Sequence, residues 1–297
     1  MMNLKNLEQA SPGKIRALFG FTSLALGQLL EAMLPILVER RAQAKASRPH
    51  RQRAVGGGRK RRLKPYQELL LTLIYLRHNV SHAVVGELFG VSADTSENTF
   101  HEVIPLLKEV CPSERWDAEK RWKKSEPTWH PDEMDRILVD SFETPIRRPS
   151  LEDRQRRTYS GKKKRHTLKT QVITDPDGEI LSIDTGHRGP KADIRIYEDS
   201  QVEEHYPHAE KIGDRAYQSQ DHPTLITPHK KPKGGELTPQ QREENRQIAQ
   251  HRIYVEHGIR RIKGWRILRE DYRLAVGLFP MIAHAVVGMV QLNQILG

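Results

Sequence analysis

The chain of 297 residues contains a single cysteine, Cys111. One cysteine excludes a disulfide framework and a cysteine-ligated zinc site, because both need several cysteines. Long apolar runs are also scarce. The most apolar N-terminal stretch, residues 24–38, is interrupted by polar residues and a proline, and it is too short to cross a bilayer. We therefore expect a protein of the reducing cytoplasm with no contact to membranes.

Acidic residues are absent from residues 40–64, which hold eleven Lys or Arg. The whole chain carries a net charge of +11, so the positive charge of this segment alone equals the net positive charge of the chain. Such a surplus indicates a polyanionic partner such as DNA, although a solvated linker is the alternative. Arg59, Lys60, Arg61 and Arg62 cluster after its glycines and are candidates for gripping a DNA backbone.

Residues 15–42 are predicted to form a helix with one apolar stripe. This stripe consists of Leu26, Leu29, Leu30, Met33 and Leu37. It could pack against the next domain, or it could form a dimer interface.

Residues 63–110 have the pattern of a three-helix unit. Pro65 suits the first turn of a helix that reaches residue 78, and a second helix is expected at 81–89. A turn at Gly90 follows, and Ser92 can cap a third helix. Two helices joined by a turn with glycine are typical of a helix-turn-helix, with Gly86 where the helices approach closely.

The start of the third helix has no Lys or Arg between residues 92 and 98. If the unit binds DNA, reading of the bases would fall to Thr95, Ser96 and Asn98, with the basic segment holding the backbone. A unit that only contacts other proteins is the alternative.

After a polar connector at 111–133, the pattern changes to strands. Strands are predicted at 136–143, 166–174, 179–185, 209–213 and 225–227, and helices at 190–204, 241–265 and 278–295. A hairpin turn is expected at 175–178, where the sequence is Asp-Pro-Asp-Gly. This order of elements indicates an α/β sheet with helical cover.

Asp140 and Asp214 each follow a short apolar run that predicts a strand. Ligands of open α/β sheets gather at the carboxyl ends of strands, so neighbouring strands would bring these carboxylates to one site. On its helix, Glu256 lies roughly 80° from the apolar residue Ile248, with Arg252 at roughly 40° and Lys263 at roughly 60°. Glu256 is thus expected on the flank of the buried face, beside two cations.

Three carboxylates can hold divalent metal ions. Their hard oxygen atoms suit Mg²⁺ or Mn²⁺, and a pair of such ions can activate an attacking oxygen and stabilise a leaving one. Arg252 and Lys263 would then hold nearby phosphates. The alternative is that these are ordinary solvated side chains.

Four ordered motifs surround the three carboxylates. They are DSFETPI at 140–146, YSGKKKRHTLK at 159–169, GDRAY at 213–217, and the run from Arg252 through Glu256 to Lys263. Together they resemble bacterial insertion-sequence transposases of the DDE superfamily, in the fifth insertion-sequence family, which is related to the Harbinger elements. The resemblance covers roughly residues 60–297. The chain departs from relatives at Ala192, Ala216 and Ala249, none of which is an expected metal ligand.

The resemblance implies an α/β RNase H-like catalytic domain, a mixed sheet with helices on both faces, preceded by an all-α helix-turn-helix domain. It implies that Asp140, Asp214 and Glu256 are the catalytic and metal-binding residues, with two Mg²⁺ or Mn²⁺ ions expected. It also implies cleavage at terminal inverted repeats and attack of the freed 3′-hydroxyl on target DNA. Lys162, Lys163, Lys164 and Arg165 are further candidates for DNA contact.

The predicted organisation has three parts. These are a helical segment with its basic linker at 1–59, a helix-turn-helix domain at 60–115 and a catalytic domain at 130–297. The expected partners are double-stranded DNA, as transposon ends and target, and further copies of the chain in a homodimer or larger synaptic assembly. The expected location is the prokaryotic cytoplasm, at the nucleoid. A metal-dependent nuclease, and a DNA-binding regulator derived from a transposase, are the alternatives.

Overall fold

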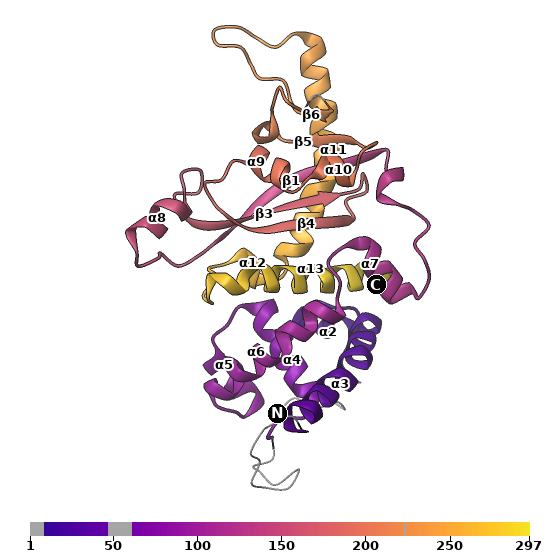
Figure 1. The fold of residues 1–297 in the computed structure, drawn as a ribbon, viewed down its shortest axis with the longest axis vertical. Coiled ribbons are helices and arrows are strands. Elements are labelled where there is room, and N and C mark those ends of the chain that lie inside the picture. Colours follow the sequence, from indigo (N-terminus) through magenta and orange to yellow (C-terminus); the bar gives the residue numbers. More distant parts are fainter. Residues whose placement is uncertain (1–8, 47–60, 223) are drawn as a thin grey trace.

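The structure is a computed structural model that describes residues 9–46, 61–222 and 224–297. Helices form one end of the molecule and a mixed sheet the other (Figure 1). The N-terminal helices are α2 (Pro12–Phe19), α3 (Ser23–Ala46), α4 (Pro65–His78), α5 (His82–Phe89), α6 (Ala93–Val110) and α7 (Arg115–Lys123). The strands are β1 (Arg136–Pro145), β2 (Tyr159–Ser160), β3 (Arg165–Thr174), β4 (Ile180–Arg188), β5 (Glu210–Gly213) and β6 (Leu225–Ile226). The other helices are α8 (Glu152–Thr158), α9 (Asp193–Asp199), α10 (Val202–His205), α11 (Pro239–Lys263), α12 (Arg266–Arg269) and α13 (Phe279–Leu296), with short 3₁₀ turns η1 (Pro131–Glu133), η2 (Arg215–Tyr217) and η3 (Val276–Leu278).

The N-terminal segment forms two helices instead of the single helix predicted at 15–42. The chain breaks after α2 at Gly20, whose φ of 79° ends that helix in the left-handed region. Of the predicted stripe on α3, Leu26, Leu29, Met33 and Leu37 are buried. They belong to a core that α4, α6 and α13 share, as the packing interpretation predicts.

The helix-turn-helix is built by local signals that the sequence shows. Ser92 caps α6 by accepting a hydrogen bond from the Thr95 N–H, and Gly90 ends α5 with a φ of 67°. Gly86 marks the close approach, because a Cβ there would lie 2.6 Å from the carbonyl oxygen of Val91. The helices predicted at 65–78 and 81–89 agree with α4 and α5.

The polar connector contains a helix that the sequence analysis did not predict. α7 has almost no apolar stripe, so its periodicity gives no signal. It is held by ion pairs of Glu119 with Arg115 and Lys123, and its Ala118 is fully buried. The helix packs against α13 and β4.

The main sheet has the strand order β4–β3–β1–β5–β6, and β2 pairs with the start of β3. β1, β3 and β4 are antiparallel neighbours, whereas β5 and β6 run parallel to β1. The turn between β3 and β4 lies at the predicted place, with Gly178 at a φ of 79°. Helix α8 and strand β2, between β1 and β3, were not predicted.

Helices cover both faces of the sheet. Leu138 and Phe142 of β1 point into the core shared with α11 and α13. Ile137 and Val139 point into a second core with Tyr197 of α9. α13 lies between the sheet and the N-terminal helices (Figure 1). Residues 276–296 form a stretch that is long and apolar enough to cross a membrane, and the bent pair α2–α3 passes the same test. Of the most apolar part of residues 276–296, 61% is buried inside the protein. This is typical of the core helix of a folded domain.

Gly86→Ala should destabilise the protein by about 1–3 kcal/mol, because the added methyl group must displace the Val91 carbonyl. Gly27→Ala, inside α3, is the matched control, since nothing lies within 4 Å of its added Cβ. Alanine there should stabilise the helix by about 0.5–1 kcal/mol. Urea unfolding of both variants measures the two changes, and the same sign in both would contradict the close approach at Gly86.

Candidate active site

Asp140 and Asp214 lie side by side on neighbouring parallel strands. The register pairs Val139 of β1 with Gly213 of β5, and each aspartate is the next residue along its chain. The two carboxylates therefore start at the same height of the sheet. The structure thus brings these two predicted site residues together.

Asp140 lies inside β1, which agrees with the strand predicted at 136–143 and corrects the expectation that Asp140 sits at the carboxyl end of that strand. β1 continues to Pro145, because its second half pairs with β3. Only the pairing with β5 stops, at Val139 and Gly213. Asp140 is the first residue of β1 beyond that pairing. Ligands of α/β sheets bind at such positions, where neighbouring parallel strands stop pairing.

The carboxylate of Asp140 is mostly buried and held by two donors. Its Oδ1 accepts a hydrogen bond from the Ser141 N–H at 2.7 Å, and its Oδ2 lies 3.3 Å from Nη2 of Arg252. Burial raises the pKa of Asp140 to about 6, and the nearby Asp214 adds to the rise, whereas Arg252 and the Ser141 N–H oppose it. Asp214 accepts from the Ala216 N–H at 2.7 Å and so caps η2.

α11 carries Arg252, Glu256 and Lys263, the other predicted residues of the site. Its buried face has Ile248, Val255, Ile259 and Ile262, as predicted. Arg252 reaches Asp140 from this helix.

Glu256 follows Arg252 by four residues, which places it about 40° further around the helix. Its side chain is exposed, and among the described residues it does not complete a metal-holding group with Asp140 and Asp214.

Lys263 lies at the other end of the same face. Its Nζ is 5.2 Å from the centre of the Phe142 ring. Burial lowers the pKa of Lys263, the charge of Lys163 lowers it further, and Asp140 and Glu143 oppose both. Arg252 and Lys263 therefore both lie on the side of α11 that faces β1, Arg252 against Asp140 and Lys263 against Phe142.

Among the described ranges 9–46, 61–222 and 224–297, no three His, Cys, Asp or Glu side chains are arranged to hold a metal ion. In this arrangement Arg252 contacts the carboxylate of Asp140. The donor chemistry nevertheless suits Mg²⁺ or Mn²⁺, because Asp140 and Asp214 present oxygen atoms at neighbouring positions.

A buried polar cluster supports the strand behind Asp140, and the sequence analysis missed it. The Ser141 hydroxyl donates to Oδ1 of Asp193 at 2.6 Å, and Nζ of Lys169 lies 3.0 Å from the same oxygen. Lys169 also donates to the carbonyl of Lys191. Alternation along β1 was the available signal, because Ser141 must face opposite to Asp140.

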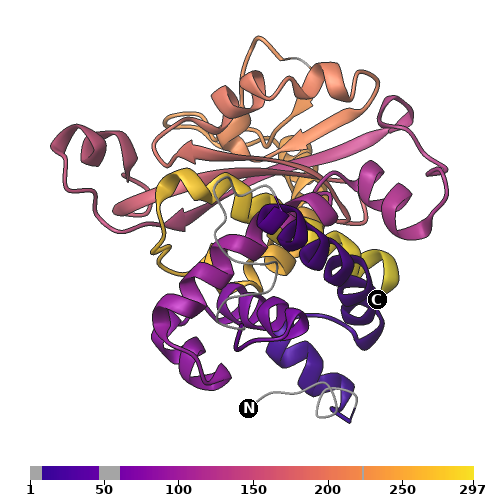
Figure 2. The same cartoon turned by 60° about the horizontal axis from the view of Figure 1, so that its bottom comes forward.

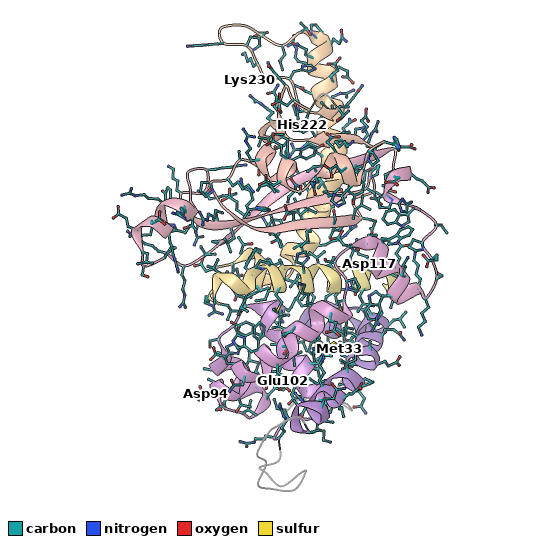
Figure 3. The ribbon with its side chains drawn as sticks, in the orientation of Figure 1. Met33, Asp94, Glu102, Asp117, His222 and Lys230 are labelled. Carbon is teal, nitrogen blue, oxygen red and sulfur yellow. The ribbon has the colours of Figure 1, made fainter. Side chains whose placement is uncertain are left out.

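The predicted base-reading residues of α6 do not all face outward. Ser96 is fully buried, and its hydroxyl lies 3.1 Å from Nδ1 of His82. This corrects the prediction for Ser96, because the close packing of α5 on α6 covers it. Thr95 and Asn98 are exposed, as is Asp94, which points outward at the edge of the helical layer (Figure 3).

The basic segment is partly engaged inside the protein. Arg59 and Lys60 lie outside the described residues. Arg61 forms ion pairs with Glu68 and Glu102 at 3.2 and 2.8 Å. Arg62 is exposed. A cavity of about 370 Å³ joins Arg61 and Arg62 to Ser92 and Thr95, so the end of the segment lies against the start of α6.

The lysines at 162, 163 and 164 are exposed in the turn between β2 and β3, and they form no ion pair with other described residues. Arg165 differs, because it pairs with Asp271 at 2.6 Å.

Lys230 lies in a second basic loop, between β6 and α11, that extends beyond the sheet (Figure 3).

Comparison with known proteins identifies the class. Residues 139–291 match a family described as DDE superfamily endonuclease, and residues 61–113 match the helix-turn-helix of DDE superfamily endonuclease. The first match spans more than half of the chain. The chain therefore belongs to the DDE superfamily of endonucleases, and its fold, a mixed sheet with helices on both faces, is RNase H-like.

Within this superfamily the chain is similar to proteins of insertion sequences. A protein of Microchaete diplosiphon, named as a transposase for insertion sequence element IS702, is 30% identical over 236 residues, which cover 78% of this chain and 82% of that protein. A protein of Streptomyces albus G, named as a transposase for IS112, is 25% identical over 245 residues, covering 82% and 84%. The crystal structure of a pre-cleavage Mos1 transpososome covers 88% of this chain and 92% of that chain at 11% identity, but the TM-score of 0.20 carries no argument.

Ser96→Ala should destabilise the protein by about 1–3 kcal/mol, because it leaves a buried ring nitrogen of His82 without its partner. Asn98→Ala, two residues further on an exposed position, is the matched control and should change stability by less than about 0.5 kcal/mol. Chemical denaturation measures both. An equal loss in the two variants would show that α6 presents a different face to solvent.

Proposed function

We propose that the chain is a DNA transposase that cleaves at the ends of its element and joins the freed 3′-hydroxyl to target DNA. The observation that carries this proposal is the level placement of Asp140 and Asp214 on neighbouring strands, under a helix that bears Arg252 and Glu256. The similarity to insertion-sequence proteins supports it. The reaction would take place on DNA in the prokaryotic cytoplasm.

Endonucleases of the DDE superfamily use divalent metal ions. Two Mg²⁺ or Mn²⁺ ions would supply Lewis-acid stabilisation of both the attacking and the leaving oxygen. Asp140, Asp214 and Glu256 are the residues that would hold them. The Asp140 carboxylate contacts Arg252, so that contact must loosen when the site binds its ligands.

The cations of the site have a direct role in this proposal. Arg252 and Lys263 lie on the α11 face beside Asp140. Without these cations, the two aspartates would repel a phosphate of the DNA backbone. Arg252 can move from Asp140 to such a phosphate and bind it through two N–H groups. Lys263, with its Nζ near the Phe142 ring, holds a second point of positive charge.

The helix-turn-helix would select the DNA. Thr95 and Asn98 are exposed on α6, and Arg62 lies with Arg61 along the cavity at the start of that helix. Side chains of α6 would read base edges, and the basic segment would hold phosphates. Transposition joins two element ends, so we infer a homodimer or a larger assembly on DNA.

Asp214→Asn and Glu256→Gln should each lower Mg²⁺-dependent cleavage of terminal-repeat DNA by more than about 100-fold, because even outer partners of metal ligands cost 10–100-fold. Cleavage and strand transfer are followed on labelled repeat ends. Glu243→Gln is the control, since Glu243 lies exposed near the N-terminal end of α11 and, among the described residues, pairs only with Arg246 and Gln247. It should cleave like the unchanged protein.

The same assay separates the alternatives. Cleavage without joining would indicate a nuclease. Binding of repeat DNA without any cleavage in Mg²⁺ would indicate a regulator derived from a transposase. If Asp214→Asn cleaved at the normal rate while folded, the assignment of the site would be wrong.

Asn98→Ala should weaken discrimination at a single base pair of the terminal repeat by about 1–3 kcal/mol, because one pair of hydrogen bonds to a base edge is lost. Affinity for unrelated DNA should stay unchanged. Binding to a panel of single-base variants of the repeat measures this. An equal loss on every sequence would assign Asn98 to the backbone instead.

A further inference from the structure

Residues 147–165, which we call the arm, project from one side of the sheet between β1 and β3. They include α8 and β2 and reach well beyond the other layers in two views (Figures 1 and 2). The arm holds nine Lys or Arg and two acidic residues, a net charge of +7 in a chain whose total is +11. After the basic segment at 40–64, this extension is a second region of concentrated positive charge.

Most of the arm's cations have no carboxylate partner. Arg156 and Arg157 pair with the two acids of the arm, and Arg165 pairs with Asp271. The other six form no ion pair with any described residue. They are Arg147, Arg148, Arg154, Lys162, Lys163 and Lys164. Unpaired charges of one sign repel one another, so a polyanion that lies along the arm would relieve that repulsion.

The base of the arm is tied to the helix-turn-helix through residues 270–274. Tyr272 donates its N–H to the carbonyl of Pro145, at the end of β1, and Asp271 pairs with Arg165. On the other side, the amide of Asn79 donates to the carbonyl of Asp271, and Arg273 donates to the carbonyl of Asn79.

Asn79 is the residue that ends α4, just before α5. The arm and the helix-turn-helix therefore share one anchor, residues 270–274, and keep a fixed relation.

The turn between β2 and β3, at the inner end of the arm, leads back to the site. Lys163 lies close enough to Lys263 to lower its pKa, and Lys263 stands over Phe142, two residues from Asp140. Positive charge therefore continues from the arm through Lys263 to Arg252. A DNA backbone held along the arm would arrive at the aspartates.

We propose that the arm is a second, sequence-independent DNA grip that binds the phosphates of the duplex held by the helix-turn-helix. This inference rests on the proposed function, because it takes DNA as the partner. Its role is to hold the stretch of duplex between the recognition helix and the carboxylates.

The test is a triple variant, Arg147→Gln, Arg154→Gln and Lys162→Gln, because these side chains form no hydrogen bond or ion pair with described residues. Binding to a random-sequence duplex of about three helical turns is measured in EDTA between 50 and 200 mM salt. Each lost phosphate contact should reduce the salt slope by about 0.9 and the affinity near 0.1 M salt by roughly tenfold. The three together should reduce the slope by up to about 2.7.

The control removes three charges on the opposite side of the molecule, Lys120→Gln, Arg121→Gln and Lys124→Gln in and just after α7 (Figure 1). It should leave the slope almost unchanged. An unchanged slope in the arm variant, or an equal loss in the control, overturns the proposal. A changed oligomeric state with an unchanged slope would assign the arm to contacts between copies of the chain. Because binding is measured without metal, failure of cleavage does not affect this result.

Discussion

The pairing of β1 with β5 is the constraint on which the site depends. It is parallel and ends at Val139 and Gly213, so the next residue of each strand emerges at the same height. Gly213 permits the tight exit of the chain, because a Cβ there would lie only 3.1 Å from Cβ of the fully buried Tyr217. The turn that follows is capped by Asp214 itself. Two carboxylates 74 residues apart in the sequence thereby become neighbours.

The helix-turn-helix is attached to this site by a shared core, not by a linker alone. α13 packs on α6 on one side and on β4 on the other. The contact is close, since a Cβ on Gly288 would lie 1.9 Å from the carbonyl oxygen of Cys111, the residue that ends α6. One continuous cluster of buried residues runs from α2 to α13. α6 and the carboxylates are therefore parts of one packed body, which fits the proposed cleavage at a set distance from a bound sequence.

The interior, the site and the arm differ in how their positive charges are paired. Inside, some cations are paired with carboxylates, as in the network of Arg41 with Glu68 and Glu102 at 2.5 and 2.6 Å. At the site, burial and the neighbouring Asp214 raise the pKa of Asp140, and Arg252 is the cation that lies against it. Outside, six of the nine cations of the arm form no ion pair with the described residues. The arm therefore offers a group of unpaired cations that a DNA backbone could follow.

The sequence by itself determined the elements whose signals lie within a few residues. These include the caps at Ser92 and Gly90, the turn at Gly178 and the buried stripe of α11 that orients Glu256. The four ordered motifs also sufficed for the superfamily. Only the tertiary structure decided that Ser96 is buried, that Arg61 is engaged with Glu68 and Glu102, and that the pairing of β1 with β5 stops just before Asp140. The reason is physical: caps and helix faces depend on neighbours three or four residues away, whereas the partner of Asp140 lies 112 residues further along the chain.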